Sequence, residues 1–446
     1  MTRTKGHIAG LTGGITAAVW LVLWAGTVSA EETAALAIST KINGADTAWM
    51  LASSALVLAM IVPGLALFYG GQVRSKNALA TMMQSFAILC LVSLLWILFG
   101  YSLAFGPDKG GVIGSLDWAG LSGVGADIHS RYAPSFPHLG FMLFQLLLAA
   151  LAPALIVGAF AERVRFSALL LVVGLWSIVV YCPLAHWVWG GGWLGKLGVL
   201  DFAGGLVVHL SAGAAGLACA LVVGKRRGYR TDYLAPHNLS LVLLGTGFLW
   251  IGWFGFNGGS ARGANAVAIG AVVATQVAAA SAALMWMVTE WNHRGKPTLL
   301  GVVSGAVAGM ATITPGAGYV SPLSAVLFGV AGSLLCYAAI VWKGKFGYDD
   351  SLDVVGIHGI GGMVGVLATG LLASKVLNPS GANGLFFGNP AQLGTQALAV
   401  CVTMVFSFVG TYVILKVVDG LIGLRVTPDE EATGLDLSQH NERAYS

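Results

Sequence analysis

The sequence has very few charged residues: only 9% of its 446 positions are Asp, Glu, Lys or Arg. A soluble domain usually carries about 25% charged residues, so a soluble fold of this length would lack a charged surface. The apolar runs are long and continuous, which also excludes a water-filled β-barrel and a disordered chain. We therefore expect a membrane protein. Its net charge of +4 gives no indication of nucleic-acid binding.

Several chemical signatures are missing as well. The five cysteines lie in apolar stretches without any CxxC spacing, which indicates free thiols packed as small hydrophobic residues. The sequence contains no Walker A motif, which argues against an ATP-driven pump. It also contains no HExxH, GxSxG or metal-type Cys/His cluster. We expect no catalytic residues, no metal site and no cofactor.

The first 30 residues have the pattern of a secretory signal peptide. Arg3 and Lys5 precede an apolar stretch over 8–24, and Val28-Ser29-Ala30 offers a cleavage site. An uncleaved first membrane helix is the alternative, but the stretch is short for a span and contains three glycines. Cleavage would leave the mature amino terminus outside.

The rest of the chain predicts an all-α polytopic membrane protein. Each crossing needs about 20 mostly apolar residues. Eleven stretches qualify after the signal: 46–68, 78–103, 138–160, 167–187, 205–224, 239–257, 265–291, 298–314, 321–342, 354–374 and 396–418. The predicted organisation is a signal peptide (1–30), a membrane domain (31–418) and a polar cytoplasmic tail (419–446).

The basic residues orient these spans. Connectors on one side and the tail carry fifteen Lys and Arg, and the outer segments after the signal carry six. Since cytoplasmic loops are enriched in basic residues, this asymmetry predicts amino terminus out, carboxyl terminus in and an odd number of spans.

Two histidines lie inside predicted spans. His209 and His358 each follow an acidic residue at a span start, Asp201 and Asp353. Ionisable groups at membrane depth are costly and are functional candidates, and the surrounding small residues allow close helix approach. A lone histidine is more often bonded to a backbone carbonyl, but two in matching contexts favour a shared polar site. We expect Asp353 to cap a helix, and Asp201 both to cap one and to attract a cation at the outer mouth.

Tryptophans gather near the outer ends of two spans. Trp187 and Trp189 precede one connector, and Trp250 and Trp253 precede Ser260. They fit either an interfacial aromatic belt or a cation–π site to which the Ser260 hydroxyl adds a hydrogen bond. These features together indicate a transporter or channel for a small polar or cationic solute.

From about residue 46 onward the sequence resembles the ammonium transporter (Amt/MEP/Rh) family, most closely the bacterial Amt type. The motifs that carry the resemblance are PGLALFYGG at 63–71, GAFAER at 158–163, DFAGGLVVH at 201–209, GWFGFN at 252–257, TPG at 314–316 and DVVGIHG at 353–359. The resemblance implies a homotrimer in the lipid bilayer of a bacterial inner membrane. Each eleven-helix subunit would have its own pore and a 5+5 inverted repeat.

The resemblance also implies site residues and a partner. The substrate-binding positions for ammonium are Trp189, Phe256, Ser260, Asp201, Trp253 and Thr314, and the pore residues are His209, His358, Phe144 and Leu148. Leu148 is a departure, because the family usually has a second stacked phenylalanine there. Bacterial members are blocked by a cytosolic P-II signal protein, whose docking surface here would be the tail and the loop 225–230.

We therefore expect electrogenic uptake of ammonium. The ion would bind at the outer site, lose its proton near Asp201 and cross as ammonia past His209 and His358, with the proton on a separate path. The alternatives are an ammonium sensor with little flux, a passive channel for neutral ammonia, and a transporter of another small amine such as methylammonium.

Overall fold

The computed structural model describes residues 42–445, and the predicted signal peptide at residues 1–30 lies outside this described part. The described chain is helical apart from connectors and a short antiparallel hairpin, β1 (Asp108–Lys109) with β2 (Ile113–Gly114). Helices suit an apolar chain, because in lipid every backbone polar group must find its partner within the segment.

The first half of the described chain ends before residue 239. Its α-helices are α2 (Gly44–Ala59), α3 (Ala66–Gln72), α4 (Ala78–Leu95), α5 (Tyr101–Phe105), α6 (His138–Phe160), α7 (Phe166–Trp176), α8 (Cys182–Ala185), α9 (Trp193–Lys196) and α10 (Ser211–Val223). π-helical turns join several of these into longer rods: η2 (Met60–Leu65), η4 (Trp96–Gly100), η6 (Ser177–Tyr181), η7 (His186–Gly190) and η8 (Gly205–Leu210).

The second half of the described chain contains a further set of bundle helices and a short helical tail. Its elements are α11 (Leu239–Gly259), α12 (Ala266–Arg294), α13 (Leu299–Ile313), α14 (Pro322–Phe346), η9 (Val355–Ile360), α15 (Gly361–Leu372), α16 (Pro390–Ile422), α17 (Pro428–Thr433) and α18 (Leu435–His440). Single 3₁₀ turns cover Ser75–Asn77, Ala119–Leu121 and Leu385–Phe387.

Within residues 42–445, ten helical segments are long and apolar enough to cross a membrane. The remaining predicted span, 298–314, corresponds to α13, which is apolar but has 15 residues. Every predicted span therefore overlaps a helix. The last one is longer than predicted, since α16 extends to Ile422, past the predicted end of the membrane domain at 418.

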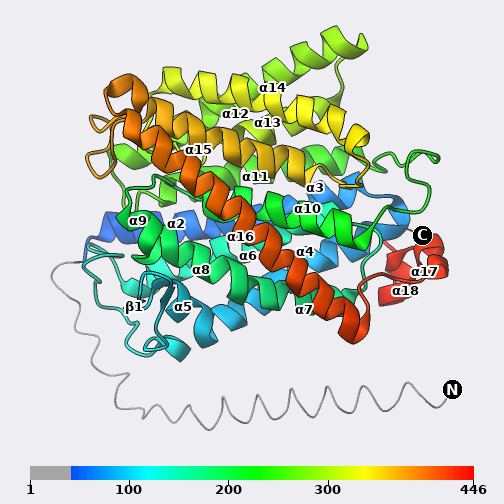
Figure 1. Cartoon of the computed structure of the whole chain (residues 1–446), viewed down its shortest axis with the longest axis horizontal. Helices are drawn as coiled ribbons and strands as arrows, with labels where there is room; N and C mark the ends of the chain where they lie inside the picture. The colour runs from blue at the N-terminus through cyan, green and yellow to red at the C-terminus, as the bar shows by residue number, and fades with distance from the viewer. Residues whose placement is uncertain (1–41, 446) are drawn as a thin grey trace. The chain divides into compact units, whose positions relative to one another are not determined.

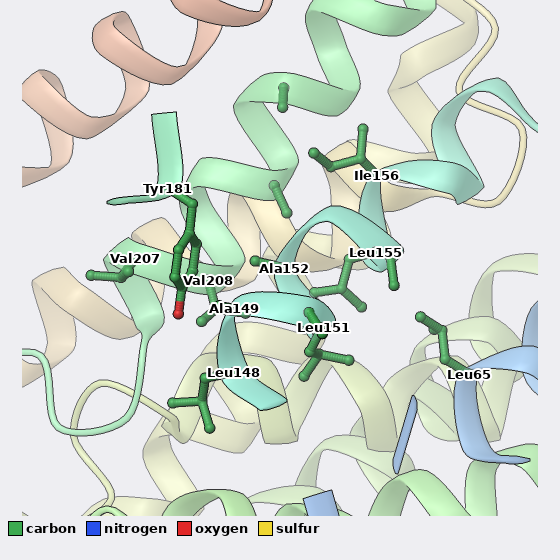
Figure 2. Close-up of a cluster of buried hydrophobic side chains, with 14 of the residues drawn as sticks. Leu65, Leu148, Ala149, Leu151, Ala152, Leu155, Ile156, Tyr181, Val207 and Val208 are labelled. Carbon is green, nitrogen blue, oxygen red and sulfur yellow. The ribbon is translucent and has the colours of Figure 1, made fainter. Parts of the chain in front are cut away.

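Helix α6 forms the centre of the helix bundle. Its sequence is apolar on all sides, with almost every residue from Phe141 to Phe160 buried, as expected for a helix surrounded by others. Figure 2 shows Leu148, Leu151 and Leu155 of α6 in one apolar cluster with Tyr181 and Val208. This packing fixes the helix that carries two predicted pore positions, Phe144 and Leu148.

The two ends of the helix bundle differ in character. The β1–β2 hairpin and the start of α2 lie at one end, and the tail helices α17 and α18 lie at the other (Figure 1). The tail is fastened there by Asp436, whose carboxylate accepts hydrogen bonds from the backbone N–H groups of Leu79 and Ala80 at the start of α4. Helix α16 runs obliquely across the bundle and packs on α7, α10 and α15 (Figure 1).

Candidate functional site

A cavity of about 570 Å³ opens at the same end as the β1–β2 hairpin. Five of the predicted site residues line it: Phe144, Leu148, Trp189, Asp201 and Ser260. Other lining residues include Arg131, Tyr132, Gln145, Arg262, Asn265, Tyr319, Asn378 and Ser380. The structure therefore gathers side chains from α6, the η7 turn, the 197–204 connector and the end of α11 around one opening.

Hydrogen bonds hold the predicted cation-binding groups in place. The indole Nε1 of Trp189 donates to the backbone carbonyl of Asp201 at 2.8 Å, which fixes the ring at the cavity wall. The hydroxyl of Ser260 donates to the carbonyl of Phe256 at 2.9 Å. Since its proton is used there, the Ser260 oxygen keeps its lone pairs for a donor in the cavity.

Asp201 is buried and caps the beginning of the η8 turn. Its Oδ1 accepts from the N–H groups of Gly204 and Gly205, and its Oδ2 accepts from Leu206 and Val207, at 2.6–3.2 Å. Four backbone donors on one carboxylate satisfy the free N–H groups of a helix start and oppose the effect of burial, which disfavours the ionised form. The carboxylate is therefore held in one position at the floor of the cavity.

The equivalent cap in the second half is Asp350, and the expectation for Asp353 was wrong. Asp350 accepts from the N–H groups of Val354 and Val355 at the start of η9, whereas Asp353 is in the left-handed region (φ 63°) and pairs with Lys343. The left-handed backbone at Asp353 carries its side chain to α14 instead. Asp350 precedes His358 by the same eight residues that separate Asp201 from His209, and this repeated spacing was the missed signal.

The two predicted pore histidines stack on each other inside the bundle. The ring centroids of His209 and His358 are 5.3 Å apart and their planes differ by 18°. Both side chains are buried. Among the described residues, three ring nitrogens of this pair lack a hydrogen-bond partner: both nitrogens of His209 and Nδ1 of His358. The alternative of a lone histidine bonded to a backbone carbonyl therefore does not apply to His209.

Aromatic rings connect this pair to the cavity side. His209 stacks on Trp253 with centroids 5.3 Å apart, and Phe256 lies 6.0 Å from His209. The indole of Trp253 donates to the Thr314 hydroxyl at 2.9 Å. The order from the cavity inward is therefore Ser260, Phe256, then the histidines, along the inner face of α11 and across to η8 and η9.

Leu148 and Phe144 occupy neighbouring turns of α6 on the cavity wall, and both are buried. A Cβ on Gly259 would meet the Phe144 ring at 2.6 Å, so the small residue before Ser260 leaves room for that ring. At Leu148 the wall is aliphatic.

Glycines explain why the histidine-bearing turns lie so close. A Cβ on Gly213 would collide with the backbone of Gly359, and one on Gly362 would reach the carbonyl of Gly205 at 2.7 Å and the Cβ of His209 at 3.2 Å. Only residues without side chains permit this contact between α10–η8 and η9–α15.

No group of three or more His, Cys, Asp or Glu is arranged to hold a metal ion within residues 42–445. What the geometry provides is a polar, partly aromatic cavity above a buried pair of imidazoles in apolar surroundings. Such an arrangement can bind a small polar solute at the mouth and handle a proton inside the membrane.

The fold and this site define a polytopic membrane protein with a polar cavity on one side of a buried, stacked histidine pair. The sequence profile of the Ammonium Transporter Family matches residues 48–445. An ammonium transporter of Bacillus subtilis is 51% identical over 401 residues, which cover 90% of this chain and 98% of that protein. The crystal structure of Candida albicans Mep2 superposes with a TM-score of 0.81 at 37% identity, covering 87% of this chain and 88% of that one. A structure described as a sensor Amt protein has a TM-score of 0.81 at 29% identity, with coverage of 89% and 98%.

The chain belongs to the ammonium transporter family, as the sequence motifs predicted.

Proposed function

We propose that the protein takes up ammonium electrogenically, by deprotonating the ion at the outer cavity and passing ammonia and a proton separately through the bundle. One observation supports this proposal most directly: two stacked imidazoles, buried and largely unpartnered, lie beside Phe256, which is four residues from the cavity-lining Ser260.

The physics of desolvation favours deprotonation. Moving a bare cation from water into an apolar path costs several kcal/mol or more, because nothing there replaces its hydration. Ammonium can avoid this cost by losing a proton, while potassium, with a similar size and charge, cannot. Selectivity against potassium follows from the chemistry of the ion.

We assign the outer binding step to Trp189, Phe256 and Ser260. Trp189 supplies a π face for a cation and Ser260 supplies a free oxygen lone pair, while the carboxylate of Asp201 favours a cation at the cavity floor. Trp253, whose indole donates to the Thr314 hydroxyl, lies farther in and stacks on His209. The histidine pair then conducts the proton, since an imidazole can accept a proton at one ring nitrogen and give one up at the other.

The assembly and the orientation are part of the same proposal. The bias of Lys and Arg supports amino terminus outside, tail inside and eleven crossings, with α13 as the short one. The matched Asp201–His209 and Asp350–His358 turns support a 5+5 inverted repeat. We further propose a homotrimer in a bacterial inner membrane, with a cleaved signal peptide and a cytosolic P-II protein docking on the tail and the loop 225–230.

An ammonium sensor is the second candidate, favoured by the similarity to a structure described as a sensor Amt protein. A sensor would bind ammonium in the cavity with little flux. A passive channel for neutral ammonia is the third candidate, and it would move nitrogen without charge.

The testing experiment records current from proteoliposomes after an ammonium pulse, with potassium as the matched cation. Sustained current with ammonium and none with potassium supports the proposal. Ammonium binding without current would favour the sensor, and nitrogen flux without current would favour the passive channel.

A further inference from the structure

The outer cavity contains two guanidinium groups, which is unexpected at the entrance of a path for a cation. Arg131 comes from the long connector between α5 and α6, and Arg262 comes from the turn between α11 and α12. Nη1 of Arg262 donates to the backbone carbonyl of Arg131 at 2.9 Å, so the two segments are joined at the cavity rim.

Both groups are held in defined positions. The guanidinium of Arg131 lies 5.5 Å from the centre of the Tyr132 ring and over Gly191, where any Cβ would collide with it. Gly191 is two residues from Trp189. Arg262 adopts the left-handed backbone region with φ 56°, which is uncommon for a residue with a side chain and is often kept at functional sites.

Neither guanidinium has an acidic partner in the described part of the chain. The salt bridges there involve Arg74, His186, Lys196, Arg226, Arg294, Lys343 and Arg425, but not Arg131 or Arg262. The carboxylate on the same cavity wall, Asp201, is occupied by four backbone donors. Desolvation at the cavity rim lowers the pKa of Arg262, and the nearby positive charge of Arg131 lowers it further.

The rest of the rim supplies neutral hydrogen-bonding groups. Asn265, Asn378 and Ser380 line the same cavity. One water needs only about 10–15 Å³ of such space, so about 570 Å³ leaves ample room beside an ammonium ion. Two guanidiniums with amide and hydroxyl groups match the donors that bind carboxylates and phosphates.

We propose that the outer cavity is also an anion site, in which Arg131 and Arg262 hold a small oxyanion, a carboxylate or phosphate, beside the ammonium site. The anion neutralises the two positive charges that an arriving ammonium ion meets. The effect of the anion on ammonium rests on the proposed function; the binding of the anion itself does not.

The expected size of the effect follows from electrostatics. A unit charge about 8 Å from the ion in a medium close to water changes the local cation concentration about twofold, and two such charges change it about fivefold. At constant ionic strength, phosphate should therefore improve the apparent affinity for ammonium about fivefold over a bulky sulfonate anion.

The direct test is calorimetric titration of the full-length purified protein with inorganic phosphate, without ammonium. The proposal predicts saturable binding to the wild type and to Lys109→Gln, an exposed charge on β1 outside the cavity lining. Binding should be lost in the Arg131→Gln, Arg262→Gln double variant. The Arg131→Lys, Arg262→Lys variant keeps the charge but loses the forked donors, and should bind about tenfold more weakly.

Absence of phosphate binding to the wild type, or equal binding by the double Gln variant, would overturn the anion site. Equal phosphate binding by the double Lys variant would also overturn the proposal, because positive charge alone, without the forked guanidinium donors, would then be enough to bind the anion. If the double Gln variant does not fold, phosphate binding by the double Lys variant serves as the test of the anion site. A protein that binds phosphate but carries no ammonium current would refute the proposed function and leave the anion site standing.

Discussion

The imidazole ring of His358 lies nearly parallel to that of His209, 5.3 Å away between centroids, although the two residues come from different halves of the chain. Two positive charges at this distance in an apolar interior would repel each other strongly. We therefore expect the pair to hold at most one extra proton at a time, which suits transfer and does not suit storage of cations.

The first prediction concerns this pair. Replacing both residues, His209→Leu with His358→Leu, removes both imidazoles of the proposed proton route. The selective ammonium current should fall more than tenfold, while the protein still reaches the membrane, since Leu fits an apolar wall. Current with unchanged size and selectivity would refute the proton-relay role.

The second prediction concerns Leu148. A phenylalanine there adds a π face to the cavity wall, and a cation–π contact is worth about 0.5–2 kcal/mol, depending on desolvation. Leu148→Phe should therefore lower the ammonium concentration for half-maximal current by roughly two- to thirtyfold. Leu148→Met serves as a control of similar volume without a ring, and its curve should match the wild type.

Much of this arrangement could be predicted from the sequence, for physical reasons. The spans are visible because apolar runs must match the bilayer, and the histidines stand out because ionisable groups are rare there. The cap at Asp350 was missed because three acids, Asp349, Asp350 and Asp353, lie close together. Only the left-handed backbone at Asp353 shows that this residue does not cap the start of η9.

Arg131 and Arg262 could not be found in the same way. They lie far apart in the sequence on two connectors, and no periodicity places connectors next to each other. The π-helical turns were also unpredicted, because a local change of helical period depends on packing against neighbouring helices rather than on an apolar pattern. The proximity of Arg131 and Arg262 at the cavity rim therefore depends on the tertiary structure and not on any local sequence pattern.

The third prediction tests the glycine contact behind the histidines. Gly213→Ala places a Cβ against the backbone of Gly359, which cannot move as a side chain could. The expected cost is about 1–3 kcal/mol of stability, together with reduced current, because His358 would shift. Thermal unfolding in detergent measures the first effect.

The matched control for that contact is Gly174→Ala in α7. Its new Cβ would meet Leu95 at an ordinary distance of 3.6 Å. This variant should unfold at or above the wild-type temperature, since alanine favours a helix over glycine. Equal destabilisation of the two variants would contradict the proposed role of close backbone contact.

The fourth prediction concerns a buried ion pair near the tail. Glu162 accepts from the backbone N–H and the Nε of Arg74 and also lies 3.6 Å from Arg226. Burial alone would raise the pKa of Glu162, but Arg226 and Arg74 outweigh it and hold that pKa below the ordinary 4.5. A lowered carboxyl pKa stabilises the fold above pH 4.5, and this contribution is lost as the pH falls through the folded-state pKa.

Glu162→Gln should therefore destabilise the protein by about 3–5 kcal/mol near pH 7. The difference in unfolding free energy between this variant and the wild type should become smaller as the pH falls below 4.5. In that range the Glu162 carboxylate of the wild type becomes protonated and its ion pair is lost. Unfolding midpoints measured across pH check this, with the exposed Glu442→Gln as control. A gap that stays constant down to strongly acidic pH would contradict the assignment.

We propose that each nitrogen crosses with one net charge, because ammonia and its proton take separate routes but are transported in a one-to-one ratio. The most direct measurement is the ratio of charge to nitrogen moved by proteoliposomes under a clamped membrane potential, using labelled ammonium and simultaneous current. We expect one charge per nitrogen at every potential, and no charge movement when the gradient is of potassium instead of ammonium. Nitrogen flux with no accompanying charge would contradict it.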